Sequence, residues 1–295
     1  MGAVELPVVV GVDGSDQSLP ALDWAADAAA RHGVPLRIVH ASLWGEYEGT
    51  ESSAGTTRFA EPLPAGRILA LAEQRVRARR PGLAISTESV AEDPAIALTR
   101  EGRNASAVVT GSRGRGVLSG LLLGSVSLAV AARADCPVIV VRGAEHRREG
   151  TGGRVVLGAG DETDGTAAAW FAFREAEARG AELLAVRAWR APAHAPRPHP
   201  LLTGEPALAH EESASFTLEE LLREPQDLHP GVTVTRRTAE GPARKVLLDA
   251  SRSADLTVVG ARRREGHHLG LQLGLVSHAV LHHAECPVAV VPQRT

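Results

Sequence analysis

Short aliphatic runs alternate with longer amphipathic segments along the chain. In the first half, these predict strands near residues 7–12, 35–41, 84–90, 105–110 and 137–142, and helices near 17–32, 64–80, 94–102 and 125–134. Continuous runs of Val, Ile and Leu are typical of parallel strands that are buried on both faces. Strands that alternate with helices indicate an α/β domain with right-handed crossovers.

The second half of the chain repeats the first. Three segments return in the same order: Val8–Gly11 as Val155–Gly158, Ala107–Gly111 as Leu256–Gly260, and Cys136–Val141 as Cys286–Val291. Strands of the second copy are expected near 154–159, 182–188, 232–238, 255–259 and 287–292. An ordered repeat of this period indicates a duplicated structural unit. The predicted fold is therefore two Rossmann-like repeats, each a doubly wound five-stranded parallel sheet.

The repeat also sets the expected domain boundaries. A chain of 295 residues fits two domains of ordinary size. We expect the first domain at residues 1–143 and the second at 154–295. Residues 144–153 are charged and rich in glycine, which favours a linker.

Composition and charge narrow the class of protein. Hydrophobic residues make up 44% of the chain and charged residues 23%, and the formal net charge is −3, so nothing indicates attraction to nucleic acid or to a membrane surface. No apolar run approaches the roughly 20 residues that span a bilayer, and no signal-peptide pattern is present. Cys136 and Cys286 occupy equivalent positions, which favours buried thiols over a disulfide. We expect a cytoplasmic protein.

A glycine pattern after the fourth strand predicts a polyphosphate site. Gly111-Ser112-Arg113-Gly114 is followed by nine residues and then by Gly124-Ser125-Val126, which opens a helix. Glycines allow the backbone to approach an anion closely. The N–H groups and the dipole of a helix N-terminus favour negative charge.

This Gly-x2-Gly-x9-Gly-Ser pattern is similar to the ATP-binding signature of the universal stress protein family. The segment Val10–Ser15 resembles that family's first strand and turn, and Cys136–Val141 its last strand. The likeness covers nearly all of residues 6–142 and, more loosely, 154–292. It implies an adenine nucleotide alpha hydrolase-like fold in both copies.

The resemblance also implies how the first copy binds ATP, with or without Mg²⁺. Asp13 would lie beside the adenine, with Gly11, Val12 and Ala41 nearby, and Gly111 under the ribose. The phosphates would be surrounded by Arg113, Gly114, Gly124, Ser125 and Val126. On the residues alone, Asp13 fits equally well as a turn former in Asp-Gly-Ser.

The second copy departs from this pattern at each of these places. Gly160 aligns with Asp13, Arg263 replaces the second glycine, and Leu275 stands where Ser125 would donate a hydroxyl. One residue is inserted before Gly274. We therefore expect a degenerate nucleotide site, although the run Arg262–Arg264 could itself attract phosphates.

Motifs of other nucleotide sites and of catalytic sites are missing. The only lysine is Lys245, so there is no P-loop lysine, and neither Gly-x-Gly-x-x-Gly after the first strand nor Gly-x-Ser-x-Gly occurs. His278 and His282 have the spacing of helical metal ligands, but no carboxylate lies between them as in zinc hydrolases, which favours surface histidines. No metal site and no catalytic residue is expected.

The sequence therefore favours a nucleotide-dependent regulatory or stress-response module without a dedicated reaction, acting on an unknown protein partner. A slow ATPase or a nucleotidyl or phosphoryl transferase is the alternative, and a structural pseudo-dimer without ligand is a third. We expect the two copies to pair through their last strands as an intramolecular pseudo-dimer. A homodimer of two whole chains is a further oligomeric state that the sequence allows.

Overall fold

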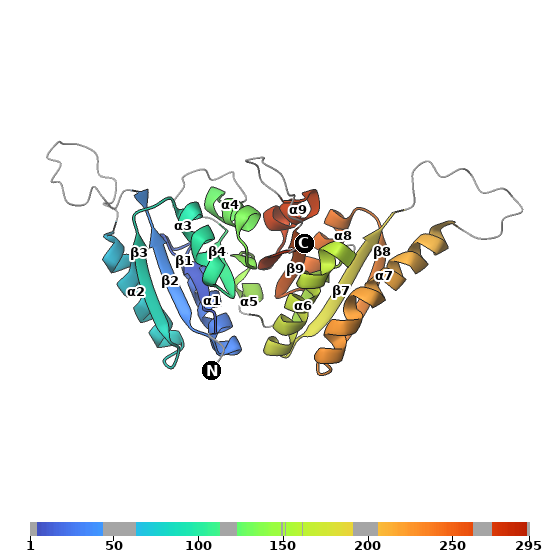
Figure 1. Ribbon diagram of the computed structural model, residues 1–295, viewed down its shortest axis with the longest axis horizontal. Coiled ribbons are helices and arrows are strands. Elements are labelled where there is room, and N and C mark those ends of the chain that lie inside the picture. Colours follow the sequence, from blue (N-terminus) through green and yellow to red (C-terminus); the bar gives the residue numbers. More distant parts are fainter. Residues whose placement is uncertain are drawn as a thin grey trace, which may run out of the picture. The chain divides into compact units, whose positions relative to one another are not determined.

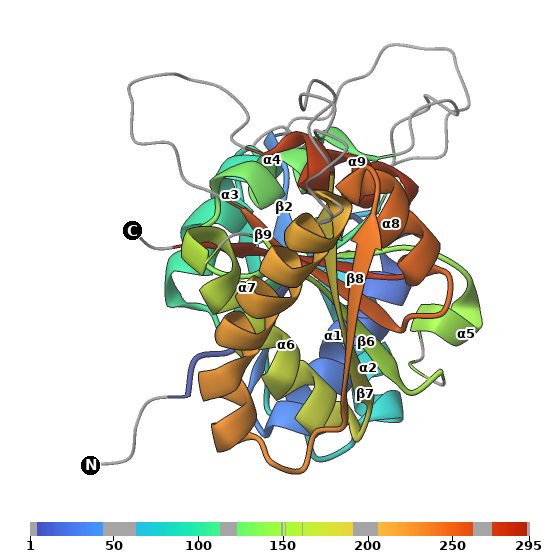
Figure 2. The ribbon, with the colours of Figure 1, turned by 90° about the vertical axis from the view of Figure 1, so that its right-hand side faces the viewer.

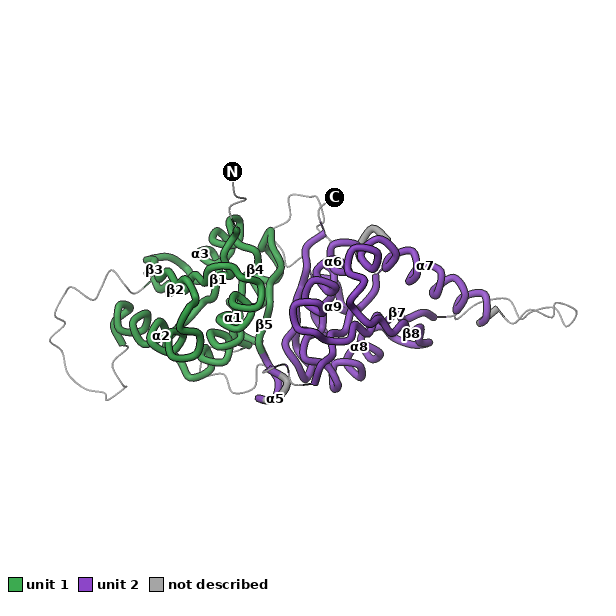
Figure 3. The backbone as a smooth tube through the Cα atoms, turned by 90° about the horizontal axis from the view of Figure 1, so that it is seen from below, with its two compact units in different colours: residues 1–141 green, residues 142–295 purple. Residues whose placement is uncertain are grey.

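The chain forms two compact units, Met1–Val141 and Arg142–Thr295 (Figure 3). The computed structural model describes residues 5–43, 63–112, 123–148, 150, 152–160, 162–190, 206–261 and 273–293. Helix α5 (Glu145–Arg148) lies within the stretch predicted as a linker. The boundaries of the linker at residues 144 and 153 stay a prediction.

The first unit contains a parallel sheet in the strand order β3-β2-β1-β4-β5 (Figure 1). Its strands are β1 (Val8–Gly11), β2 (Leu36–Ala41), β3 (Ile85–Val90), β4 (Ala107–Gly111) and β5 (Val138–Val141). Strand β1 pairs with β2 on one side and with β4 on the other, and all pairings are parallel. The strand order reverses at β1, which is the position where open α/β sheets bind ligands.

Two pairs of helices cover the sheet of the first unit. They are α1 (Leu19–His32), α2 (Ala65–Arg79), α3 (Pro94–Glu101) and α4 (Ser125–Arg133). Helix α1 packs on α2, and α3 packs on α4. Between these layers the core is aliphatic, and Val9, Val10 and Leu22 are fully buried.

Local sequence signals explain where several helices begin and end. The side chain of Asp93 accepts hydrogen bonds from the backbone N–H groups of Ala95 and Ile96, and Pro94 is the first residue of α3. Helix α1 ends at Gly33, whose φ of 68° is left-handed and suits glycine. These local residues therefore mark where α3 begins and where α1 ends.

The second unit has the same topology, with the strand order β10-β9-β6-β7-β8. Its strands are β6 (Arg154–Gly158), β7 (Glu182–Trp189), β8 (Val234–Glu240), β9 (Leu256–Ala261) and β10 (Val288–Pro292). Its longer helices are α6 (Glu162–Arg179), α7 (Pro206–Leu228), α8 (Ala243–Ser251) and α9 (Leu275–His283). Helix α6 packs on α7 and α8 on α9 (Figure 2). The prediction of two doubly wound five-stranded repeats is confirmed.

The two cysteines and the apolar character of the helices were also subjects of prediction. Cys136 and Cys286 are both buried, and neither forms a disulfide. Among the helices that the structure describes, none combines the length and the apolar character needed to cross a bilayer.

Candidate functional site

Three of the predicted site residues end neighbouring strands of the first sheet. Gly11 is the last residue of β1, Ala41 of β2 and Gly111 of β4. Because these strands are parallel and β1 lies between the other two, the three residues reach the same edge of the sheet. The residues that follow them form the candidate site, which we call the carboxyl edge of the first unit.

Asp13 forms a tight turn at this edge. One carboxylate oxygen, Oδ1, accepts hydrogen bonds from the backbone N–H of Ser15 at 3.0 Å and from its hydroxyl at 2.6 Å. Gly14 between them has a φ of 75°, a conformation that glycine adopts without strain. Asp13 therefore acts as a turn former, and the turn holds its carboxylate just after the end of β1.

Val12 is held in place by strand β2. Its N–H donates to the carbonyl oxygen of Val39 at 2.9 Å, and its own carbonyl oxygen lies 2.8 Å from Nδ1 of His40. His40 is buried, and a bond to a carbonyl requires the proton to sit on Nδ1. Sequence reasoning missed His40, although a histidine in the aliphatic run Leu36–Ala41 is a visible signal.

The glycine at the end of the first strand has a packing role in both units. A Cβ atom on Gly11 would lie 2.7 Å from Cδ1 of Leu98, which packs from α3. In the second unit, a Cβ atom on Gly158 would lie 2.8 Å from Cδ1 of Leu247 in α8. A repeated requirement for close helix packing explains these glycines without any ligand.

The predicted phosphate loop is closed where it meets helix α4. The N–H of Gly124 donates to the carbonyl oxygen of Ser112 at 2.8 Å, so the two ends of the loop are joined. Arg113 and Gly114, which were predicted to contact phosphate, lie outside the described residues.

Helix α4 begins without a side-chain cap. Gly124 is its N-cap, with extended backbone (φ −70°, ψ 148°), and as a glycine it has no side chain that could bond to the first turn. Ser125 and Val126 are the first two helical residues, and the first intrahelical bond runs from the N–H of Leu128 to the carbonyl of Gly124. The N–H groups before Leu128 have no partner within the helix, which suits an anion.

The corresponding edge of the second unit carries a different side chain. The register places Gly158 opposite Val186 as it places Gly11 opposite Val39, so Arg187 stands at the position of His40. The guanidinium of Arg187 donates a hydrogen bond to the carbonyl oxygen of Gly160, which aligns with Asp13. The second unit therefore has a guanidinium bonded to the backbone of the residue that aligns with Asp13.

Helix α9 begins as α4 does but presents an apolar residue. Its N-cap Gly274 has almost the same backbone angles (φ −63°, ψ 157°), and its first residue, Leu275, is 90% exposed. Although one residue is inserted before Gly274, this glycine is the N-cap of its helix, as Gly124 is in the first unit. The residues Arg262–Arg264 lie outside the described part of the chain.

The histidines of α9 form a stacked pair. The ring centroids of His278 and His282 are 4.4 Å apart. Burial lowers the pKa of His282, and the charges of His278, His283 and Arg142 lower it further. Among the described residues, no group of three or more His, Cys, Asp or Glu side chains is arranged to hold a metal ion.

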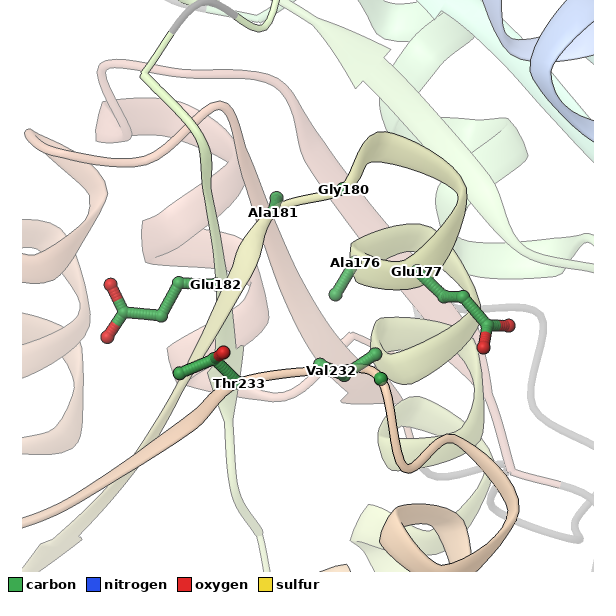
Figure 4. Close-up of a pocket in the computed structure, with 8 residues that line it drawn as sticks. Ala176, Glu177, Gly180, Ala181, Glu182, Val232 and Thr233 are labelled. Carbon is green, nitrogen blue, oxygen red and sulfur yellow. The ribbon is translucent and has the colours of Figure 1, made fainter.

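A pocket of about 320 Å³ lies in the second unit at the opposite edge of the sheet (Figure 4). It is lined by the end of α6 and by the residues at the start of β7 and before β8. The carboxylates of Glu177 and Glu182 point to opposite sides and are paired, with His229 at 2.8 Å and Arg154 at 3.1 Å. These pairings leave no converging charges for a nucleotide.

Comparison with known proteins gives consistent matches over the whole chain. The model of the universal stress protein family matches residues 6–142 and 153–292. A universal stress protein of Mycobacterium tuberculosis is 35% identical over 305 residues, with 97% of each chain covered. One from Mycolicibacterium smegmatis is 33% identical over 303 residues, with 99% of each covered. The crystal structure of one from Archaeoglobus fulgidus aligns with a TM-score of 0.65 at 17% identity, covering 97% of this chain and 98% of its own.

Proposed function

This chain belongs to the universal stress protein family, and from that premise we propose that it is an ATP-binding regulatory module of a stress response. ATP binds at the carboxyl edge of the first unit. The observation that carries this proposal is the junction of three strand ends with a helix N-terminus that has no side-chain cap. Such a junction offers backbone N–H groups and the positive end of a helix dipole to a polyphosphate.

The residues of this edge match the parts of the nucleotide. Gly11, Val12, Asp13 and Ala41 surround the adenine in the proposal, and Gly111 lies under the ribose. Gly124, Ser125 and Val126 face the phosphates, together with Arg113 and Gly114 from outside the described residues. In the proposal, ATP binds with or without Mg²⁺.

The proposed site is asymmetric between the two units. In the second unit, Arg187 bonds the carbonyl of Gly160 and an exposed Leu275 begins helix α9. Gly160 has no carboxylate at the position of Asp13, and Leu275 has no hydroxyl at the position of Ser125. We therefore propose one ATP for each chain, bound by the first domain, with residues 144–153 as the linker to a second domain whose site is degenerate.

Binding without a dedicated reaction is part of the proposal. Fast phosphoryl transfer uses a lysine at the phosphates, and the single lysine, Lys245, lies in α8 of the second unit. Bound ATP would act by changing the surface that the carboxyl edge of the first unit offers to a protein partner, as a shift in populations. The pairing of the two copies through their last strands stays a prediction, as does a homodimer.

Binding stoichiometry tests the location of the site. Calorimetric titration of the wild-type chain should give one ATP for each chain. Gly124→Val should remove it, because a branched side chain at the helix start blocks the N–H groups. Loss of two charge-assisted hydrogen bonds weakens binding by roughly 10²- to 10⁴-fold.

The chain supplies its own control for this variant. Gly274→Val places the same side chain at the start of α9, where a Cβ atom would meet nothing within 4 Å. This variant should retain one ATP with wild-type affinity. Two sites in the wild type, or one site that survives Gly124→Val, would contradict the proposal.

A second measurement separates binding from reaction. Mass spectrometry of the nucleotide released from the denatured protein should find ATP alone if the chain only binds it. A mixture of ATP and ADP that shifts toward ADP with incubation would favour the slow ATPase. No nucleotide and no titration would favour the purely structural pseudo-dimer.

A further inference from the structure

Ser127 connects helix α4 to the end of strand β4. Its hydroxyl donates a hydrogen bond to the carbonyl oxygen of Gly111 at 2.6 Å, and the residue is 5% exposed. Ser127 is the third residue of α4, and Gly111 is the last residue of β4. The bond therefore spans the predicted phosphate loop from one side to the other.

This bond works together with the backbone closure of the loop. The N–H of Gly124 donates to Ser112, so two consecutive strand-end residues, Gly111 and Ser112, each hold one residue of the helix start. Two hydrogen bonds to successive residues fix both the position of the first turn and its rotation about the helix axis. A serine in a first turn commonly bonds within its own helix, whereas this one bonds the strand.

The second unit repeats the side-chain bond. The hydroxyl of Ser277 donates to the carbonyl oxygen of Gly260 at 3.0 Å, and Ser277 is also 5% exposed. The loops that precede the two helices differ in length and composition. The bond is therefore a property of the strand–helix junction rather than of the loop.

We propose that Ser127 is a positioning residue of the nucleotide site, which aims the N–H groups of Ser125 and Val126 at the phosphates by fixing the start of α4 against Gly111. The inference rests on the proposed binding of ATP to the first unit. Donors that are already oriented need no rearrangement when the anion arrives, which increases affinity. Ser277 makes the equivalent side-chain bond in the second unit, where Leu275 replaces Ser125.

Three variants of the full-length chain test this role: Ser127→Ala, Ser127→Thr and, as the matched control, Ser277→Ala. Ser127→Ala should weaken ATP binding by roughly 3- to 10-fold, the effect of one hydrogen bond. The same variant should change the affinity for adenosine by less than about twofold, because adenosine has no phosphates to be aimed at. Ser127→Thr, which keeps the hydroxyl, should restore ATP binding.

The control separates positioning from general stability. Ser127→Ala and Ser277→Ala each remove one equivalent buried hydrogen bond, so both should lower the melting temperature by similar amounts. Only Ser127→Ala should also weaken the binding of ATP. Equal losses of affinity for ATP and adenosine, or an equal loss of ATP affinity in Ser277→Ala, would overturn the positioning role.

Hydrogen exchange without nucleotide distinguishes this inference from the proposed function. The amide of Gly124 should exchange several-fold faster in Ser127→Ala than in the wild type, because the junction opens more often. Unchanged exchange overturns the fixation of the helix start by Ser127. A wild-type chain that binds no ATP overturns the proposed function, even where the exchange result supports the fixation.

Discussion

Nδ1 of the buried His40 lies 2.8 Å from the carbonyl oxygen of Val12, and this bond ties the end of strand β1 to its neighbour β2. Val12 immediately precedes Asp13, whose carboxylate shapes the following turn. The side chain of His40 therefore fixes the backbone that is proposed to surround the adenine, although His40 is not the last residue of its strand. In the second unit, Arg187 at the same register position bonds a different carbonyl, that of Gly160.

We predict that His40→Leu weakens both the fold and ATP binding. Leucine fills a similar volume but leaves the carbonyl of Val12 without its donor, which costs about 1–3 kcal/mol in the free energy of unfolding. Urea unfolding and calorimetric titration measure the two effects. Arg187→Leu is the control and should leave ATP affinity unchanged. A destabilised His40→Leu chain with wild-type affinity would remove Val12 from the site.

The close approach of Leu98 to Gly11 gives a second prediction, which is measured as the free energy of unfolding. Gly11→Ala should destabilise the first unit by about 1–3 kcal/mol, since its Cβ would lie 2.7 Å from a buried side chain. In the double variant Gly11→Ala/Leu98→Ala, the total loss should be smaller than the sum of the single losses. Additive losses in urea unfolding would show that Leu98 is not the cause.

A glycine in open space serves as the reference for this substitution. A Cβ atom on Gly66, in the first turn of α2, would meet nothing within 4 Å. Gly66→Ala should therefore stabilise the chain by about 0.4–1 kcal/mol, because alanine has less conformational freedom in the unfolded state. If Gly66→Ala stabilises the chain while Gly11→Ala destabilises it, the loss at Gly11 is due to the contact with Leu98 and not to the replacement of glycine by alanine as such.

Thr110 gives a third prediction. Its side chain is 3% exposed, and within the described residues its hydroxyl has no hydrogen-bond partner. The equivalent residue of the second unit is Val259. Thr110→Val keeps the shape and removes a buried polar group, so it should raise the free energy of unfolding by about 1 kcal/mol.

Thr257 provides the contrast to Thr110. Its hydroxyl oxygen lies 3.2 Å from Sγ of Cys286, so this buried hydroxyl has a partner. Thr257→Val should bring no gain in stability, or a small loss. If both valine variants gave the same gain in urea unfolding, the missing partner would not explain the effect at Thr110.

The sequence predicted the strands and helices because aliphatic runs and caps act locally. Asp93-Pro94 and Gly124-Ser125 mark helix starts that the structure has at those residues. The roles of His40 and Ser127 could not be predicted in this way. Each depends on a carbonyl group that is distant in the chain, Val12 for His40 and Gly111 for Ser127.

Gly11 can be interpreted from the sequence in two ways. A glycine after a buried strand is typical of ligand contact, yet Leu98, which is 87 positions away in the sequence, already requires it. The same contact between Gly158 and Leu247 occurs in the unit where no nucleotide is expected. Packing between distant residues and contact with a ligand select the same residue type, so the sequence alone cannot separate them.

The last prediction concerns pH and the carboxylate of Asp27 in helix α1. Asp27 is 8% exposed and accepts hydrogen bonds from Arg79 at 2.8 and 2.9 Å and from Arg80 at 2.9 Å. Burial by itself would raise the pKa of Asp27, but the hydrogen bonds and charges of Arg79 and Arg80 outweigh it and lower the pKa below its ordinary value. The folded state therefore binds the proton of Asp27 less readily than the unfolded state does.

The sign of the pH effect follows from this difference. Above the pKa of the unfolded chain, Asp27 is ionised in both states and its stabilisation is fully present; it is lost as the pH falls through the lowered pKa of the folded state. Asp27→Asn should therefore lower the free energy of unfolding near pH 7, and its stability should fall less than that of the wild type as the pH falls below 3.8, the ordinary pKa of an aspartate. Urea unfolding at several pH values measures this. Glu73→Gln, which breaks the exposed pair with Arg77, should cost only about 0.3–0.5 kcal/mol at pH 7. Parallel pH profiles for the wild type and Asp27→Asn would show that the two arginines do not hold this carboxylate ionised.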